Sequence, residues 1–177
     1  MGFHAVLMPK LNPLPLDARD KVCRHIDALF GAGVSETLPA TDNDNSMKFE
    51  YSRKTGRIKN FSIDGALAAT LRTDGGLALT VEGAQFFVNN SRAFLENCVV
   101  PAEEAVPFVS EGRSLFCRHV TWCGSNVKAG SDIAVLDKKE NGSVIAVGIA
   151  ILGAGLMNKF SKGVAVKVRE GIKGRTA

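Results

Sequence analysis

The second half of the chain alternates short apolar runs with tight turns, and this pattern constrains the fold more than any other feature. The strand-like runs cover residues 114–121, 132–136, 144–152 and 164–169. They are separated by Gly124-Ser125, Gly130 and Asn141-Gly142, and an Asn-Gly pair is a strong signal for a tight hairpin turn. A short helix is expected over residues 102–110, because two glutamates suit its positive end and Gly112 stops it. Several short strands with one helix predict a small β-barrel.

The first half combines helix and strand patterns. A helix is expected over residues 17–30, where apolar side chains recur at helical spacing and Gly31 supplies a stop. Residues 35–46 are polar, include the run Thr-Asp-Asn-Asp-Asn at 41–45, and are predicted to form a surface loop. Short β-type runs follow at residues 47–52, 57–63, 67–72 and 77–81, and a second helix pattern covers residues 82–95. The turn residues between the β-type runs predict an antiparallel meander, so this half is expected to be α+β.

The positive charge of the chain is confined to its second half. Residues 1–100 carry 11 Lys+Arg and 11 Asp+Glu, whereas residues 101–177 carry 11 Lys+Arg and 7 Asp+Glu, so the net charge of +4 falls on the second part. A polyanionic partner is expected to dock on such a basic half. Ordinary solubility explains an excess of four charges equally well, so charge alone leaves both interpretations open.

No sequence pattern indicates a membrane span, a metal site, a cofactor or a catalytic centre. The most apolar stretch, residues 143–156, is interrupted by glycines and is too short to cross a bilayer, and residues 1–9 are a poor secretory signal. The chain is therefore expected to stay in the cytoplasm, with its four cysteines as buried, reduced thiols. The cysteines lack the close pairing of zinc ligands, and none of the three histidines has a nucleophile and a carboxylate at a catalytic spacing.

An ordered series of short motifs runs through the second half. The series consists of Val99-Val100, Pro107-Phe108-Val109, Gly112-Arg113-Ser114-Leu115-Phe116, Gly130-Ser131-Asp132, Ala146-Val147-Gly148 and the segment from Lys162 to Arg169. Over residues 99–171 this order resembles a PUA domain, the module named after pseudouridine synthase and archaeosine transglycosylase, and especially the C-terminal PUA domain of archaeal tRNA-guanine transglycosylases. Residues 49–58 and 69–84 similarly resemble the domain that precedes PUA in those enzymes. The fold is therefore expected to be α+β, with a pre-PUA-like domain over residues 1–97 and a mostly β PUA pseudo-barrel over residues 98–177.

The resemblance leaves out the catalytic part of those enzymes. They carry their catalytic aspartates and a cysteine-rich zinc cluster on a TIM barrel, which needs about 250 residues. This chain has 177 residues, without the alternating strand-helix repetition of such a barrel and without clustered cysteines. The resemblance therefore implies only the RNA-holding parts, and neither a catalytic nor a metal-binding residue is assigned.

In the PUA family the short helix, the strand after it and the loop before the final strand form a groove for an RNA stem and its 3′ end. By this resemblance Gly112 lets the backbone approach a phosphate, Arg113 can hold the phosphate by a bidentate fork, and Ser114 can donate one more hydrogen bond. The basic tail that begins at Arg169 is a further candidate, although a frayed, solvated terminus explains it equally well.

The remaining candidates flank this loop. Alternation along the strand places Phe116 and Arg118 on the face opposite Leu115 and Cys117. A second wall is expected from the small residues 153–157 and the lysines behind them, although a loose hairpin loop is the plain alternative. The full set of candidate RNA-binding residues is Gly112, Arg113, Ser114, Phe116, Arg118, Gly155, Met157, Lys159, Lys162 and Arg169.

These patterns support three hypotheses about function. The first is a non-catalytic protein that binds structured RNA, with tRNA as the favoured ligand, by shape and backbone contacts. The second is a substrate-binding subunit of a split tRNA-modifying enzyme, which would need a separate catalytic protein as its partner. The third is a ribosome-assembly or translation factor, since PUA domains also occur in such proteins.

Overall fold

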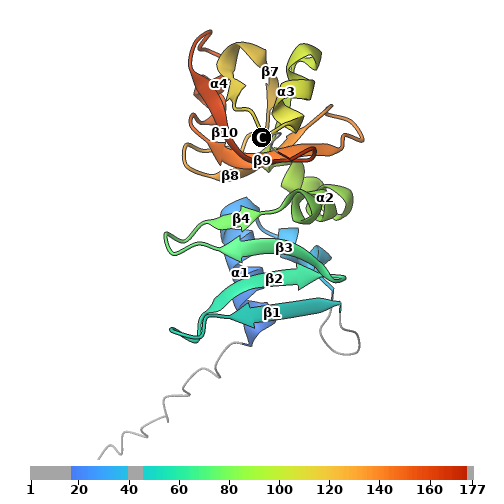
Figure 1. Ribbon diagram of the computed structural model, residues 1–177, viewed down its shortest axis with the longest axis vertical. Coiled ribbons are helices and arrows are strands. Elements are labelled where there is room, and N and C mark those ends of the chain that lie inside the picture. The colour runs from blue at the N-terminus through green and yellow to red at the C-terminus, as the bar shows by residue number, and fades with distance from the viewer. Residues whose placement is uncertain (1–16, 40–45, 175–177) are drawn as a thin grey trace, which may run out of the picture.

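The computed structural model describes residues 17–39 and 46–174, arranged as two parts stacked along the long axis of the molecule (Figure 1). We call residues 17–97 the N-terminal layer and residues 98–174 the barrel. The polar run predicted as a loop at residues 41–45 lies outside the described residues. No helix among the described residues is long and apolar enough to span a membrane.

The N-terminal layer is a four-stranded antiparallel sheet with helices packed against it. Its strands, in order across the sheet, are β1 (Met47–Tyr51), β2 (Ile58–Ile63), β3 (Ala66–Leu71) and β4 (Leu77–Leu79). Its helices are α1 (Ala18–Phe30), the 3-10 helix η1 (Val34–Thr37), α2 (Val81–Asn90) and the 3-10 helix η2 (Arg92–Asn97). The predicted antiparallel meander and the α+β character of this half are thus confirmed.

Helix α1 has the boundaries that its sequence predicts. Asp17 caps it, because its side chain accepts a hydrogen bond of 2.7 Å from the Asp20 amide, and Gly31 follows its last residue with a φ of 115°. The segment after it begins with η1 rather than with irregular loop. The reason is that Asp27 accepts hydrogen bonds from both the amide and the hydroxyl of Ser35, at 2.8 and 2.9 Å.

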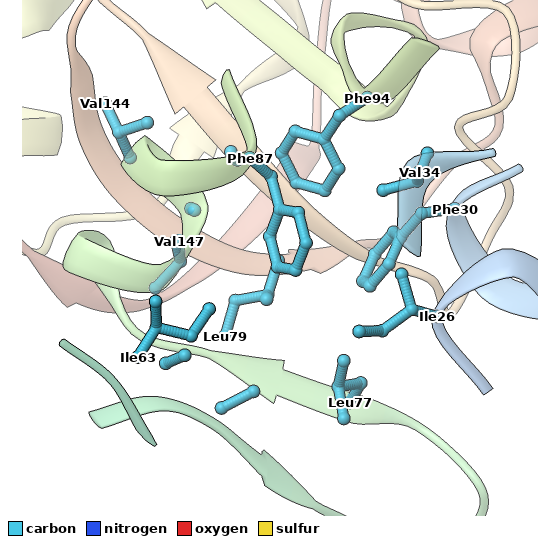
Figure 2. Packing of buried hydrophobic residues seen from close by; sticks show 14 of the residues in the cluster. Ile26, Phe30, Val34, Ile63, Leu77, Leu79, Phe87, Phe94, Val144 and Val147 are labelled. Carbon is cyan, nitrogen blue, oxygen red and sulfur yellow. The ribbon is translucent and has the colours of Figure 1, made fainter. Parts of the chain in front are cut away.

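The second helix is shorter than predicted. Residues 82–95 were expected to form one helix, but α2 ends at Asn90 and a separate 3-10 helix follows. The break at extended Ser91 turns Phe94 back into the core, where its ring lies 5.2 Å from that of Phe30 and 5.3 Å from that of Phe87 (Figure 2). The packing of these three aromatic rings stabilises the broken helix relative to a continuous one.

The barrel is a six-stranded sheet that curls on itself. Its strands are β5 (Cys98–Pro101), β6 (Leu115–Phe116), β7 (Val120–Cys123), β8 (Asp132–Leu136), β9 (Val144–Ala150) and β10 (Val164–Gly171), and their order is β6-β10-β9-β8-β5-β7. Its helical turns are η3 (Glu103–Ala105), α3 (Val106–Ser110), η4 (Cys117–His119) and α4 (Ala154–Met157). The two edge strands, β6 and β7, are joined by η4 alone, so the edges of the sheet meet there and the barrel nearly closes. The predicted PUA-like pseudo-barrel is confirmed.

The expectation of one strand over residues 114–121 is wrong. Helix η4 interrupts it, because the chain must turn from one edge of the sheet to the other at this point. The predicted alternation nevertheless holds for burial: Leu115 and Cys117 are buried, whereas Phe116 and Arg118 are exposed.

One hydrophobic cluster runs from the N-terminal layer into the outer face of the barrel. Phe87 of α2 packs in the same cluster as Val144 and Val147 of β9, and all three side chains are fully buried (Figure 2). Every residue of β8 is buried. Ile133 and Val135 belong to the cluster inside the barrel, whereas Ala134 and Leu136 belong to the shared cluster. The two parts therefore share a continuous core rather than a wet interface.

A buried carboxylate reinforces this junction. Asp132, with 4% of its side chain exposed, accepts hydrogen bonds from Arg72 at 3.2 Å, from Arg169 at 2.9 Å and from the Leu77 amide at 3.2 Å. Arg169 also donates to the Leu79 carbonyl at 2.7 Å. Arg72 forms a second ion pair with exposed Asp74, and this hydrogen bond holds the pKa of Asp74 below its ordinary value. Residues of three strands are thus joined through one anion.

The end of α3 is fixed against the end of β10. The Ser110 carbonyl accepts a hydrogen bond of 2.9 Å from the Lys173 amide, and Gly112 follows with a φ of 87°. A Cβ atom on Gly171 would lie 2.3 Å from the Ser110 carbonyl oxygen and 2.5 Å from the Gly112 nitrogen. Only glycine allows the two segments to approach this closely.

The first prediction concerns Asp132. Asp132→Ala leaves two arginines without their shared anion and the Leu77 amide without an acceptor, and we expect it to lower the free energy of unfolding by about 2–4 kcal/mol. Urea denaturation measures this loss. The matched control is Asp74→Ala, which removes the exposed partner of Arg72 and should have a much smaller effect. Equal losses in the two variants would contradict the role assigned to Asp132.

The second prediction concerns Gly171. Gly171→Ala forces the backbone of residues 110–112 away from β10, and we expect a loss of about 1–3 kcal/mol in thermal or urea unfolding. Gly155→Ala is the control, because nothing lies within 4 Å of the added Cβ and the backbone there needs no positive φ. Stability of Gly171→Ala equal to that of the control would show that the close approach is not required.

Candidate nucleic-acid interface

The loop between α3 and β6 presents the first group of candidate residues. Gly112 is buried and its amide donates a hydrogen bond of 2.9 Å to the Val109 carbonyl, which turns the chain sharply before Arg113. The Arg113 side chain is 68% exposed and lies 5.3 Å above the ring of Phe108. Its one ion-pair partner among the described residues is Glu111, at 3.8 Å. The guanidinium is therefore oriented by an aromatic ring and open to an external anion.

The edge strand β6 brings the second group together. Phe116, which is 47% exposed, lies opposite Val164 of β10, and the amide of Cys117 donates a hydrogen bond of 3.0 Å to the Gly163 carbonyl. The loop that ends at Lys162 and Gly163 therefore lies beside the exposed ring. The predicted meeting of the strand after the helix with the loop before the last strand is seen in the structure.

The segment at residues 153–157 is a helical turn, α4, and not the loose hairpin loop of the alternative interpretation. Met157 is fully buried in the cluster inside the barrel. The sequence predicted it on the binding surface, and its side chain does not reach that surface. Gly155 is exposed with open space around it, and Lys159 and Lys162 are also exposed. Met157 is the side chain of this turn that packs into the apolar cluster inside the barrel, and an apolar side chain is stabilised there.

Arg118 and Arg169 are less available than their sequence positions suggest. Arg118 donates a hydrogen bond of 2.9 Å to the Nε2 atom of His119, whose Nδ1 atom lies 3.3 Å from the carboxylate of Glu104. Arg169 is held at the domain junction by buried Asp132, so its guanidinium is committed to the fold. Arg169 thus has a structural role at the junction, and its expected role as an RNA contact stays a prediction.

Three exposed apolar side chains near β6 and α4 were not among the sequence candidates. Ile151 is 45% exposed, Leu156 47% and Phe160 50%, and the Ile151 amide pairs with the Ala165 carbonyl at the start of β10. Phe160 stands between Lys159 and Lys162, and an aromatic residue among lysines in a loop is the signal that could have identified it. Aromatic rings on a cationic surface can stack with unpaired bases.

The four thiols of the chain are all at least partly buried. Cys98 and Cys117 are buried, while Cys23 and Cys123 are partly buried and none is in a disulfide. Burial raises the pKa of Cys98 and raises that of Cys123 to about 11, so both are protonated at neutral pH. Among the described residues no group of three or more His, Cys, Asp or Glu side chains is arranged to hold a metal ion.

Comparison with known families identifies both parts of the chain. Residues 98–172 match the PUA domain, and residues 21–93 match the patch-forming domain C2 of tRNA-guanine transglycosylase. Both matches agree with the resemblance noted in the sequence.

The tRNA-guanine(15) transglycosylases are similar in sequence to most of this chain. The tRNA-guanine(15) transglycosylase of Methanobrevibacter smithii is 32% identical over 158 residues, which are 89% of this chain and 23% of the relative. That of Thermoplasma volcanium is 33% identical over 158 residues, covering 86% of this chain and 23% of the relative. The chain therefore spans about a quarter of the length of these transglycosylases.

Solved structures share the fold of both parts. A hypothetical protein from Pyrococcus horikoshii superimposes with a TM-score of 0.63 at 17% identity, covering 86% of this chain and 89% of that chain. A PUA domain protein from Aeropyrum pernix superimposes with a TM-score of 0.58 at 15% identity, covering 89% and 84%. The chain is a PUA-domain protein in which a domain of the C2 patch-forming type precedes the PUA domain, and over these two domains it resembles the tRNA-guanine(15) transglycosylases.

Proposed function

We propose that this chain is a non-catalytic RNA-binding protein that recognises structured RNA, with tRNA as the favoured ligand, through its PUA domain. The observation that carries the proposal is the juxtaposition of exposed Phe116 with the Lys162-Gly163 loop on one edge of a PUA barrel, next to the open guanidinium of Arg113. We further propose that the two domains divide between residues 97 and 98. The relatives named as tRNA-guanine transglycosylases favour tRNA over other structured RNAs.

The proposed binding surface combines two kinds of contact. Arg113, Lys159 and Lys162 supply positive charge to phosphates, and no described carboxylate approaches either lysine closely enough for an ion pair. Phe116 and Phe160 supply exposed rings for unpaired bases. An RNA with a stem and a single-stranded end satisfies both kinds of contact. The revised set is Gly112, Arg113, Ser114, Phe116, Gly155, Lys159, Phe160 and Lys162, with Arg118 at its margin.

A binding role is also supported by the extent of the similarity. The matches to transglycosylases cover about a quarter of those enzymes, and the family matches assign that quarter to the C2 and PUA domains. The same observation favours a second candidate function, a substrate-binding subunit that works with a separate catalytic protein. Co-purification with such a protein, or an increase in its activity on addition of this chain, distinguishes the second candidate from a protein that acts alone.

The third prediction concerns Arg113. Titration of the protein with a tRNA pool at several salt concentrations should show binding that weakens steeply as salt rises, because counterions are released from the RNA. Arg113→Ala should weaken binding roughly tenfold and reduce the salt slope by about one. Trimming the 3′ end of the tRNA should also weaken binding by the wild type.

The control for Arg113 is Arg92→Ala, which removes an exposed cation from η2 in the other domain. Equal affinities of the two variants would exclude Arg113 from the interface. No binding of any tRNA by the wild type would refute the proposed function itself.

The fourth prediction separates stacking from charge. Phe116→Ala should weaken binding of tRNA with an intact 3′ end by about 1–3 kcal/mol, the typical contribution of one stacked base, while leaving the salt slope unchanged. Leu67→Ala, which truncates a side chain of similar exposure (41%) on β3, is the control. A changed salt slope, or equal losses in the two variants, would contradict a stacking role.

A further inference from the structure

A groove of about 440 Å³ opens where the two domains meet. Helix α2 lies between the first sheet and the barrel, so both domains contribute to its walls (Figure 1). Ile63 from the sheet and Val144 from the barrel, both labelled in Figure 2, line it together. We call this surface the junction groove, and its apolar wall consists of Ile63, Ala66, Val81, Phe86, Val144 and Ile172.

The floor of the junction groove is held in place by contacts within the fold. Helix α2 packs directly on β3, because a Cβ atom on Gly83 would lie 2.0 Å from the Ala68 carbonyl oxygen. The Gln85 side chain accepts a hydrogen bond of 2.7 Å from the Val144 amide and donates one of 2.8 Å to the Asn89 side chain. The polar atoms of Gln85 thus have partners inside the protein. The groove therefore offers a fixed apolar surface, on which a partner binds without first ordering the protein.

Much of this apolar surface is open to solvent. Ile172 is 55% exposed, Ala66 is exposed, and Phe86 is only partly buried. The Ile172 amide donates a hydrogen bond of 2.9 Å to the Ile145 carbonyl, which fixes this residue at the rim of the groove. A small-molecule site encloses most of its ligand, whereas the junction groove leaves its outer wall in solvent. Exposed apolar surface beside charged residues is typical of a contact between proteins.

The rim of the junction groove is acidic. Asp64 and Glu82 line it, and none of its described lining residues is Lys, Arg or His. No described cation forms an ion pair with Asp64, Glu82 or Glu170. Burial raises the pKa of Glu170, and the charge of nearby Glu82 raises it further. Carboxylates without cations beside them repel phosphates and attract Lys or Arg side chains.

We propose that the junction groove is a protein-docking surface, whose partner is an amphipathic segment with apolar side chains flanked by Lys or Arg. The apolar side chains of this segment pack on Phe86 and Ile172, and its cations pair with Asp64 and Glu82. The same carboxylates repel RNA, so the groove and the cationic PUA edge select different classes of partner. The inference goes beyond the proposed function, because it holds whether or not the PUA domain binds tRNA.

The test uses the full chain and two labelled synthetic peptides, with fluorescence anisotropy as the measurement. Both peptides place leucines at helical positions i, i+3, i+4 and i+7, and the flanking residues are lysine in one peptide and glutamate in the other. The lysine peptide should bind the wild type at least about tenfold more tightly, because like charges oppose binding of the glutamate peptide.

The apolar contact is tested at Ile172. Ile172→Ser should weaken binding of the lysine peptide roughly tenfold, as expected for truncation of a side chain that anchors an interface. The matched control is Ile151→Ser, since Ile151 is 45% exposed and does not line the groove. The tRNA affinity of Ile172→Ser should equal that of the wild type.

The charge of the rim is tested with a second pair of variants. Asp64→Asn with Glu82→Gln should weaken binding of the lysine peptide and reduce its dependence on salt. Asparagine suits position 64, where φ is 49°. The control is Glu103→Gln with Glu140→Gln, which removes two exposed carboxylates elsewhere on the barrel.

Several results would overturn the inference. They are no binding of the lysine peptide by the wild type, equal affinities for the two peptides, and equal losses in a variant and its control. A dimer in analytical ultracentrifugation that Ile172→Ser dissociates would instead assign the groove to a second copy of the chain. A loss of tRNA affinity in Ile172→Ser would assign it to RNA. Absence of tRNA binding by the wild type would refute the proposed function and leave this inference standing.

Discussion

The burial of β8 and β9 on both of their faces is the constraint on which the rest of the structure depends. Ile133 and Val135 point into the barrel, while Ala134 and Leu136 belong to the core shared with α2 and the first sheet. A strand buried on both sides cannot shift without exposing one of two cores. Asp132 stands at the start of the same strand and joins arginines from both domains. The PUA barrel is therefore also a structural partner of the first domain.

Features set by nearby residues could be predicted from the sequence, and those set by distant contacts could not. The stop of α1, the meander and the turn at Gly112 depend on residues within a few positions, and the structure contains all of them. The break of the expected strand at η4 depends on closure of the barrel, which joins strands far apart in sequence. The burial of Met157 has the same origin. Neither a local pattern nor a spacing rule contains this information.

The two arginines on either side of the final strands illustrate the difference for the candidate site. Arg113 follows the turn at Gly112, which the sequence predicts, and the Arg113 side chain is exposed. Arg169 lies in a basic tail, and its commitment to Asp132 involves an anion 37 positions earlier in the chain. A count of charges treats the two residues alike. In the same way, a net charge summed over a hundred residues does not show where the charges lie, although charges farther apart than about 8 Å are largely screened from one another in physiological salt.

The shared core also bears on how firmly the proposed RNA-binding surface is held. Contacts that sit on one rigid body form without the ordering entropy that a flexible linker would require. The domains here are joined by a continuous hydrophobic cluster and by the contacts of Asp132, not by a linker. Under the proposed function, modest contacts along the PUA edge then reinforce one another for an RNA whose shape matches them. Selectivity for one folded RNA over others would follow from the fixed geometry of this edge, even though backbone contacts carry no sequence information themselves.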